Sequence, residues 1–182
     1  MPTPNIPGLR YIPEYIDLRT HDELLDMVSG QTWMEIPGQR RMQFYGYAYD
    51  YASKSIKRSG TLPAWAARIA ENIRRDGLSP HTPVQLSVIE YAPGQGIFNH
   101  VDVEVFSDVV IISLVSPCVM DFLDSQSDAT ASLLLEPRSA LVLSGDARYR
   151  WQHGIAARAS DAWDGANIVR ARRVSLTFRN VK

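Results

Sequence analysis

Short runs of apolar and β-branched residues, separated by turn-forming residues, characterise the chain from Val84 onward. Runs of about four to eight such residues are typical of strands in a sandwich or barrel. A polar stretch at 124–130 predicts a hairpin loop, and the glycine-containing segments 94–96 and 144–146 predict tight turns. The predicted strands are Gln85–Tyr91, Val109–Val115, Cys118–Phe122, Ser132–Leu135, Ala140–Leu143 and Val174–Phe178. Residues 84–182 therefore predict an all-β core.

The preceding segment, residues 1–83, combines two helical signals with one polar-faced strand. Thr20–Glu23 reads Thr-His-Asp-Glu, a capping box that predicts the start of a helix at Thr20. Pro63, apolar residues at three- and four-residue spacing after it, and Gly77 as a stop signal predict a second helix. Between these helices, alternating phenols predict a single strand that carries all of them on one face. The phenols are Tyr45, Tyr47, Tyr49 and Tyr51.

Composition narrows the class of protein. The chain has 182 residues, of which 45% are hydrophobic and 21% charged, and these values are typical of one soluble globular domain. A net charge of -1 argues against a protein that binds mainly by coating a long phosphate backbone. Cys118 is the single cysteine, which excludes an internal disulfide and a Cys-rich zinc site. Because the sequence has no signal peptide and no apolar run of membrane-spanning length, we expect a cytoplasmic monomer without membrane association.

A candidate metal site begins at His100-Val101-Asp102. Residues two apart on a strand point to the same side, so both side chains could bind one ion. Chance gives roughly 0.3 such pairs in a chain of this composition, so a third ligand is needed, and His153 is the candidate. Two histidines and one carboxylate suit non-haem iron(II), because they leave open positions for a co-substrate and dioxygen; zinc is the rival metal. Alternatively, His100 caps a turn and His153 is a packed imidazole.

A candidate anion site lies near the carboxyl end of the chain. Arg173 and Arg179 are six residues apart, so on a strand they share one face with Ser175 and Thr177. Two guanidiniums that face a barrel interior need anions, because an unpaired buried charge costs several kcal/mol. A dicarboxylate would satisfy both, and the planar fork of arginine binds carboxylates through two hydrogen bonds. The alternative is a surface strand with solvated arginines.

The order of these motifs resembles that of the AlkB family of Fe(II)/2-oxoglutarate-dependent dioxygenases. The similarity covers most of the chain from about Arg40 and is closest to the branch that includes the tRNA wobble-uridine hydroxylase. It implies an α+β fold: a double-stranded β-helix, or jelly-roll, core at 84–182, with N-terminal helices packed outside it and a substrate-facing strand or nucleotide-recognition lid within 1–83. The similar blocks are Gln43–Tyr47, Tyr91–Ile97, Ser113–Leu114, Val119–Phe122, Pro137–Ser139, Ser144–Tyr149 and His153–Ile155.

The same resemblance implies a catalytic iron held by His100, Asp102 and His153. Such a centre uses O2 to convert 2-oxoglutarate to succinate and CO2 and hydroxylates a substrate C–H bond. Hydroxylation of an N-methyl group removes the methyl as formaldehyde, whereas hydroxylation of a carbon substituent is retained. The resemblance thus implies an enzyme with Fe(II), 2-oxoglutarate and O2 as cofactor and co-substrates.

Co-substrate binding is also implied by the resemblance. Arg173, with Tyr91 and Ser175, would bind the far carboxylate of 2-oxoglutarate, and Arg179 would face the carboxylate beside the metal. One position departs from the family pattern: many relatives have an asparagine where this chain has Ile89. The loss of one amide hydrogen bond should weaken co-substrate binding by about 0.5 to 1.5 kcal/mol.

The substrate prediction rests on the strand of phenols. Tyr45, Tyr47 and Tyr49 on one strand face would form an aromatic platform with a basic border, a combination that stacks bases and holds phosphates. The basic border is Arg40, Arg41, Lys54, Lys57 and Arg58. Glu104 would lie near the target base if its strand continued past Asp102. These residues favour a single-stranded or flipped-out nucleotide in DNA, RNA or tRNA. The alternatives are a Tyr-rich edge strand without such a role, a protein or small-molecule hydroxylase with the same iron site, and a catalytically silent binding module, which Ile89 suggests.

Overall fold

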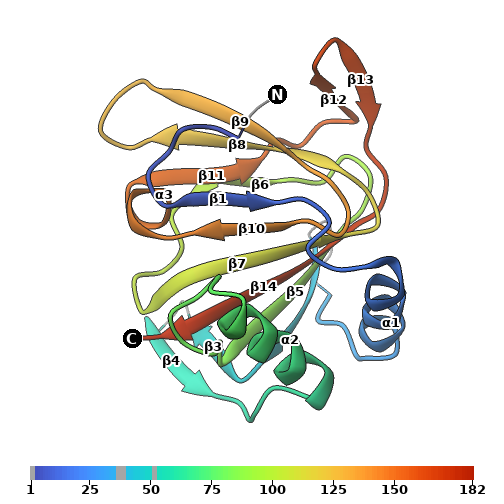
Figure 1. Ribbon diagram of the computed structural model, residues 1–182, viewed down its shortest axis with the longest axis vertical. Coiled ribbons are helices and arrows are strands. Elements are labelled where there is room, and N and C mark those ends of the chain that lie inside the picture. The colour runs from blue at the N-terminus through green and yellow to red at the C-terminus, as the bar shows by residue number, and fades with distance from the viewer. Residues whose placement is uncertain (1–2, 36–39, 51–52) are drawn as a thin grey trace.

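The protein is built on two facing antiparallel sheets (Figure 1). The computed structural model describes residues 3–35, 40–50 and 53–182. Within these ranges the larger sheet has six strands, in the order β1 (Leu9–Ile12), β10 (Ala140–Leu143), β7 (Phe106–Leu114), β14 (Arg173–Val181), β5 (Gln85–Tyr91) and β2 (Arg41–Tyr45). The smaller sheet of the described chain has four, in the order β6 (Ile97–His100), β11 (Trp151–Ile155), β8 (Cys118–Asp124) and β9 (Thr130–Leu135). The predicted jelly-roll core is thereby confirmed.

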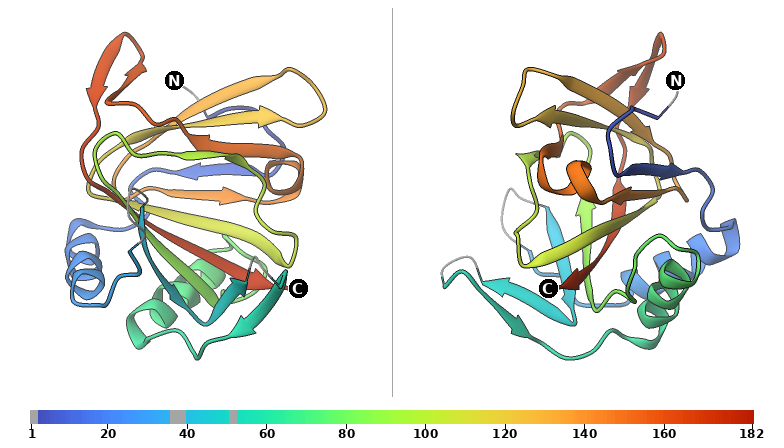
Figure 2. Two further views of the ribbon diagram at one scale, coloured as in Figure 1. Left: turned by 180° about the vertical axis from the view of Figure 1, so that it is seen from behind. Right: turned by 60° about the vertical axis from the view of Figure 1, so that its left-hand side comes forward.

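Helices and short hairpins surround these sheets. Helices α1 (Leu18–Ser29) and α2 (Ala64–Arg75) lie together beside the larger sheet (Figure 2), and α3 (Gly145–Tyr149) connects β10 to β11. Two separate hairpins join β3 (Tyr47–Asp50) to β4 (Ser55–Arg58) and β12 (Ser160–Trp163) to β13 (Ala166–Val169). The predicted helices outside the core are therefore present.

Strand β14 shows how alternation places the core and the site on opposite faces of one sheet. Val174, Leu176 and Phe178 are fully buried in the cluster that also contains apolar residues of α1 and α2. Ser175 and Thr177 point the other way, into the space between the two sheets. On the helix side, burial of apolar surface stabilises the sheet by about 25 cal/mol per Å². The inner face of the sheet is therefore free to carry polar groups.

Helix α1 begins three residues earlier than the capping box predicted. Its N-cap is Asp17, whose Oδ1 accepts a hydrogen bond of 2.8 Å from the backbone amide of Thr20. Aspartate satisfies an otherwise unpaired amide of the first turn as well as threonine does, so Thr20 becomes the third helical residue. Helix α2 follows its signals, with Pro63 as N-cap and Gly77 beyond its end at φ 68°.

The predicted single strand of phenols is wrong, because the chain turns at Gly46. This glycine has φ 78°, and a Cβ there would lie 1.9 Å from the carbonyl oxygen of Val84. Strand β2 therefore ends at Tyr45 and β3 starts at Tyr47 in a separate hairpin. Tyr51 lies outside the described residues.

Elsewhere the predicted strands are found, and most are longer than predicted. β5 and β10 have the predicted bounds, and the 124–130 loop joins β8 to β9. Ser144 is the N-cap of α3 and does not form the predicted tight turn. No helix in the described part of the chain has the length and apolar character of a membrane span.

Candidate active site

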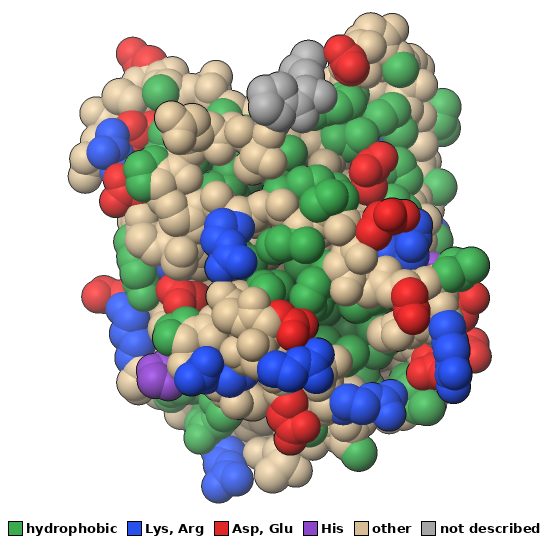
Figure 3. All heavy atoms as spheres, viewed as in Figure 1, with side chains coloured by type: hydrophobic (Ala, Val, Ile, Leu, Met, Phe, Trp, Pro, Cys, Tyr) green, Lys and Arg blue, Asp and Glu red, His purple; other side chains and the backbone are tan. Residues whose placement is uncertain are grey.

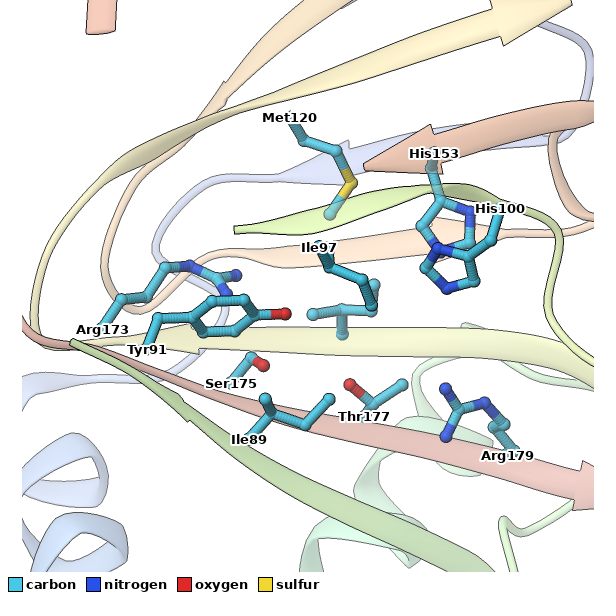
Figure 4. A pocket seen from close by; sticks show the side chains of 11 residues that line it. Ile89, Tyr91, Ile97, His100, Met120, His153, Arg173, Ser175, Thr177 and Arg179 are labelled. Atoms are coloured by element: carbon cyan, nitrogen blue, oxygen red, sulfur yellow. The ribbon is translucent and has the colours of Figure 1, made fainter. Parts of the chain in front are cut away.

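A pocket opens between the two sheets, with its polar side chains on β14, β5, β6 and β11. Figure 4 shows imidazoles at one end and a guanidinium beside a phenol at the other. The polar lining residues are Tyr91, His100, His153, Arg173, Ser175, Thr177 and Arg179, and the apolar ones are Ile89, Ile97, Ile111 and Met120.

The imidazole end of the pocket, or metal end, brings together the three predicted metal ligands. His100 on β6 and His153 on β11 are register partners, with ring centroids 4.6 Å apart. The Oδ2 atom of Asp102 lies 3.9 Å from the Nε2 atom of His153. Strand β6 ends at His100, so a loop, not the strand period used in the prediction, positions Asp102.

Burial and neighbouring charges set the protonation states at this end. Burial alone would raise the pKa of Asp102, but the charges of Arg179 and His153 outweigh it and lower the pKa to about 2. Burial lowers the pKa of His153 to about 4, against the opposing effect of Asp102. At neutral pH the site therefore contains a carboxylate and a neutral imidazole, which are the forms that bind a divalent metal.

The available donor atoms fit a metal. Asp102 Oδ2 and His153 Nδ1 are buried without a hydrogen-bond partner. The Nδ1 atom of His100 lies 2.8 Å from the carbonyl oxygen of Phe98, and since a carbonyl only accepts, Nδ1 donates and the Nε2 lone pair is free to bind a metal. No three His, Cys, Asp or Glu side chains in the described ranges form a ready cluster; one oxygen of Asp102 is held by Arg179 at 2.8 Å. The residues thus fit a metal by type, burial and free donor atoms.

The other end of the pocket is an incomplete anion site. Arg173 is 3% exposed, and its Nη2 atom donates to Ser113 Oγ at 3.0 Å while its Nε atom is buried without a partner. In the described part of the chain no carboxylate forms an ion pair with it. Its guanidinium carbon lies 5.3 Å from the centre of the Tyr91 ring, and burial raises the pKa of that phenol, so Tyr91 stays a hydrogen-bond donor. A bound anion would complete this end.

Arg179 is positioned by residues that the sequence analysis missed. Its Nη1 atom donates to Gln85 Oε1 and Ser87 Oγ, each at 3.2 Å, while Nη2 pairs with Asp102. Gln85 and Ser87 are buried polar residues on the inward-facing positions of β5. Gln85 and Ser87 alternate with apolar Leu86 and Val88, and this alternation was a signal in the sequence. Ile89, the next inward position, lines the pocket as the family comparison implied.

A comparison with protein-family models matches residues 8–179 to the 2OG-Fe(II) oxygenase superfamily. The chain belongs to this superfamily. The oxygenase is 34% identical to the Alkylated DNA repair protein ALKBH8 homolog of Arabidopsis thaliana, over 98% of this chain and 59% of that protein. It is 33% identical to the tRNA (carboxymethyluridine(34)-5-O)-methyltransferase ALKBH8 of Mus musculus, over 97% of this chain and 31% of that protein. The chain therefore spans about a third to three fifths of the length of these AlkB relatives.

A solved structure, OsALKBH1, has the same fold as this oxygenase. The two superpose with a TM-score of 0.73 at 16% sequence identity, over 95% of this chain and 96% of the other. At this identity the likeness concerns the fold alone. The AlkB resemblance inferred from the motifs is confirmed by the sequence relatives, and the jelly roll by this structure.

The oxygenase does not present the predicted aromatic platform. Arg41 pairs with Glu90 at 2.7 Å and lies over the Trp33 ring at 4.6 Å, and Tyr45 packs edge-on against Trp65 of α2, with ring centroids 6.0 Å apart. Both side chains thus face away from the pocket, on the helix side of the sheet. Tyr47 lies half-buried on β3, and Glu104 is exposed in a turn beyond the end of β6.

Other residues occupy the pocket-side face of β2. Met42 is the register partner of Ile89, and Phe44 is the partner of Ser87, so both lie on the face that lines the pocket. Phe98, two residues before His100, is 94% exposed. The face in Figure 3 shows Lys and Arg side chains interspersed with Asp and Glu side chains, which suits local contacts rather than a long basic track.

Gly154 supports the metal end of the oxygenase by allowing β6 to approach β11. An added Cβ would lie 2.2 Å from Asn99 Oδ1, 2.8 Å from Asn99 N and 2.9 Å from Ile97 O. We expect Gly154→Ala to push His100 away from His153, to destabilise the fold by about 1 to 3 kcal/mol and to reduce succinate formation. Thermal unfolding and turnover measure these effects.

A matched control is Gly30→Ala at the end of α1. A Cβ at Gly30 would approach no heavy atom closer than 3.6 Å, and its φ is -75°. This variant should have the thermal stability and the turnover of the wild type. Wild-type stability and turnover in Gly154→Ala would contradict the role given to the close approach of the two strands.

Proposed function

We propose that this chain is an Fe(II)/2-oxoglutarate-dependent dioxygenase that hydroxylates or oxidatively demethylates a modified base in nucleic acid. The observation that carries the proposal is that the two ends of one pocket carry different functional groups. Two histidines and an aspartate gather at one end, and a buried arginine without a carboxylate partner among the described residues lies at the other. A five-carbon diacid that reaches from the metal to a guanidinium suits this arrangement.

His100, Asp102 and His153 would hold the iron. When bound, Fe(II) supplies the activation of O2 that converts 2-oxoglutarate to succinate and CO2 and oxidises a substrate C–H bond. Asp102 contributes a negative charge that stays ionised at neutral pH, since its pKa is about 2. With only these three protein ligands, the centre would leave room for the co-substrate and dioxygen.

Arg173 would bind the far carboxylate of 2-oxoglutarate, with the Tyr91 hydroxyl donating a further hydrogen bond. The hydroxyls of Ser175 and Thr177 lie along the floor of the pocket between its two ends (Figure 4). Arg179 would face the carboxylate beside the metal while keeping its hydrogen bond to Asp102. Ile111 and Met120 are nearly fully buried and help to exclude water from the pocket.

Support for a nucleic-acid substrate comes from the relatives, whose names refer to alkylated DNA repair and to a tRNA uridine. The placement of Arg41 and Tyr45 gives no support, since both are engaged on the helix side. Phe44 and the highly exposed Phe98 are the aromatic side chains we would assign to base contact. Stacking of a base on an aromatic ring is worth about 1 to 3 kcal/mol.

The test is succinate formation by the iron-loaded protein, followed by mass spectrometry of nucleosides. We expect 2-oxoglutarate turnover that is stimulated by total tRNA or by alkylated DNA, with loss or hydroxylation of a modified nucleoside. Turnover without nucleic-acid stimulation would favour a protein or small-molecule hydroxylase. Absence of any turnover with iron present would favour a silent binding module and contradict the proposal.

A further inference from the structure

Arg148 on α3 is among the largest fully buried side chains in the described ranges, at 1% exposure, yet it does not line the pocket. In the described part of the chain it forms no ion pair with an Asp or Glu side chain within 4.0 Å. Burial lowers the pKa of Arg148. A buried charge without a counter-ion is costly unless other groups satisfy it, so its hydrogen-bond partners reveal its role.

Those partners are all backbone carbonyls of residues 102–107, which comprise the end of the connection from β6 to β7 and the first two residues of β7; this segment is the 102–107 loop. Nη1 donates to the carbonyl of Asp102 at 3.1 Å, and Nε to that of Ser107 at 2.7 Å. Nη2 donates to the carbonyls of Val103 at 2.8 Å and Phe106 at 2.7 Å. The planar guanidinium can reach several acceptors at fixed angles, and here it gathers four carbonyls of a single loop.

The loop needs such a partner because no sheet holds its first residues. β6 ends at His100 and β7 begins at Phe106, and within the loop Phe106 N donates to Val103 O at 3.1 Å. Unpaired buried carbonyls would each cost free energy. Arg148 therefore supplies donors where strand pairing stops.

The loop also delivers two groups to the metal end. The Asp102 carboxylate accepts from Arg179 at 2.8 Å, and the Phe106 ring lies 5.4 Å from the guanidinium carbon of Arg179. Arg148 itself precedes β11, the strand that carries His153. One side chain thus ties the segment of one candidate ligand to the segment of another.

We propose that Arg148 is a positioning residue that fixes the 102–107 loop and so aims the Asp102 carboxylate at the metal end of the pocket. It acts through the loop and touches neither metal nor co-substrate. The inference deepens the proposed function and rests on it for the identity of the site, whereas the control of loop shape is a property of the metal-free protein.

The first experiment is amide hydrogen exchange of the metal-free protein, followed by mass spectrometry of peptides that span 101–108. The variants are Arg148→Lys, which keeps the charge but not the planar fork, and Arg148→Met, which keeps the length without donors. Both should accelerate exchange in this loop while peptides from α2 and β9 exchange as in the wild type. If Arg148→Met does not fold, Arg148→Lys carries the test.

The second experiment measures Co(II) binding through the visible absorption of the bound ion. Removal of outer partners of metal ligands typically costs about tenfold to hundredfold in affinity, and we expect a loss of that size in Arg148→Lys. Arg150→Met is the matched control, because Arg150 lies two residues away and pairs with Asp124 at the end of β8, not with the 102–107 loop. It should bind Co(II) like the wild type.

Unchanged loop exchange, or acceleration spread evenly over the whole chain, would overturn the proposal. So would wild-type Co(II) affinity in Arg148→Lys. If the wild type binds no Co(II) or forms no succinate, the proposed function fails instead, and loop exchange in the metal-free protein still tests the role of Arg148.

Discussion

Asp102→Ala should reduce succinate formation to background at every iron concentration tested. The side chain is the only carboxylate among the predicted ligands, and its Oδ2 atom is buried without a hydrogen-bond partner. Its removal also leaves Arg179 buried without its ion pair, and breaking such a pair typically costs about 3 to 5 kcal/mol. Turnover must therefore be measured below the thermal midpoint of the variant, with folding checked by circular dichroism.

Two comparisons separate ligand loss from unfolding. Asp128→Ala removes an exposed carboxylate from the loop between β8 and β9, so it should behave like the wild type. Folded Asp102→Ala should lose Co(II) binding as well as succinate formation. Succinate formation at the wild-type rate in this variant would show that Asp102 is not a ligand.

Arg173→Gln should raise the KM for 2-oxoglutarate by about a hundredfold to a thousandfold, with kcat at saturation retained. The expected size follows from about 3 to 5 kcal/mol for a buried charge pair deprived of one partner, at about 1.4 kcal/mol per factor of ten. The same change should leave the free protein as stable as the wild type or more so. The reason is that Arg173 is buried with an unpaired Nε and has no carboxylate partner in the described ranges.

A higher KM for 2-oxoglutarate together with unchanged or higher stability distinguishes a binding residue from a structural one. Arg172→Gln is the control, because Arg172 pairs with Glu90 on the helix side at 2.7 Å and is more exposed than Arg173. It should leave the KM unchanged and slightly lower stability. An unchanged KM in Arg173→Gln would remove the co-substrate role assigned to this end of the pocket.

Alternation along single strands explains why much of the fold was predictable. Val174, Leu176 and Phe178 had to face a core, because their burial stabilises the sheet, and this placed Arg173, Ser175 and Arg179 on the inner face. The same logic failed at Gly46, where a left-handed backbone ends the strand. A glycine in a strand-like pattern can continue the strand or end it, and at Gly46 the close approach of Val84 decides between the two.

The sequence by itself determined six strands of the two sheets, the residue types of the candidate metal and anion sites, and the inward face of β14, since periodicity is a local property. Only the tertiary structure decided that His153 meets His100 across an antiparallel pair and that Arg41 and Tyr45 turn toward the helices. It also decided that Arg148 holds the loop of Asp102. These relations depend on register and on hydrogen bonds between segments distant in the chain, and no local pattern encodes them.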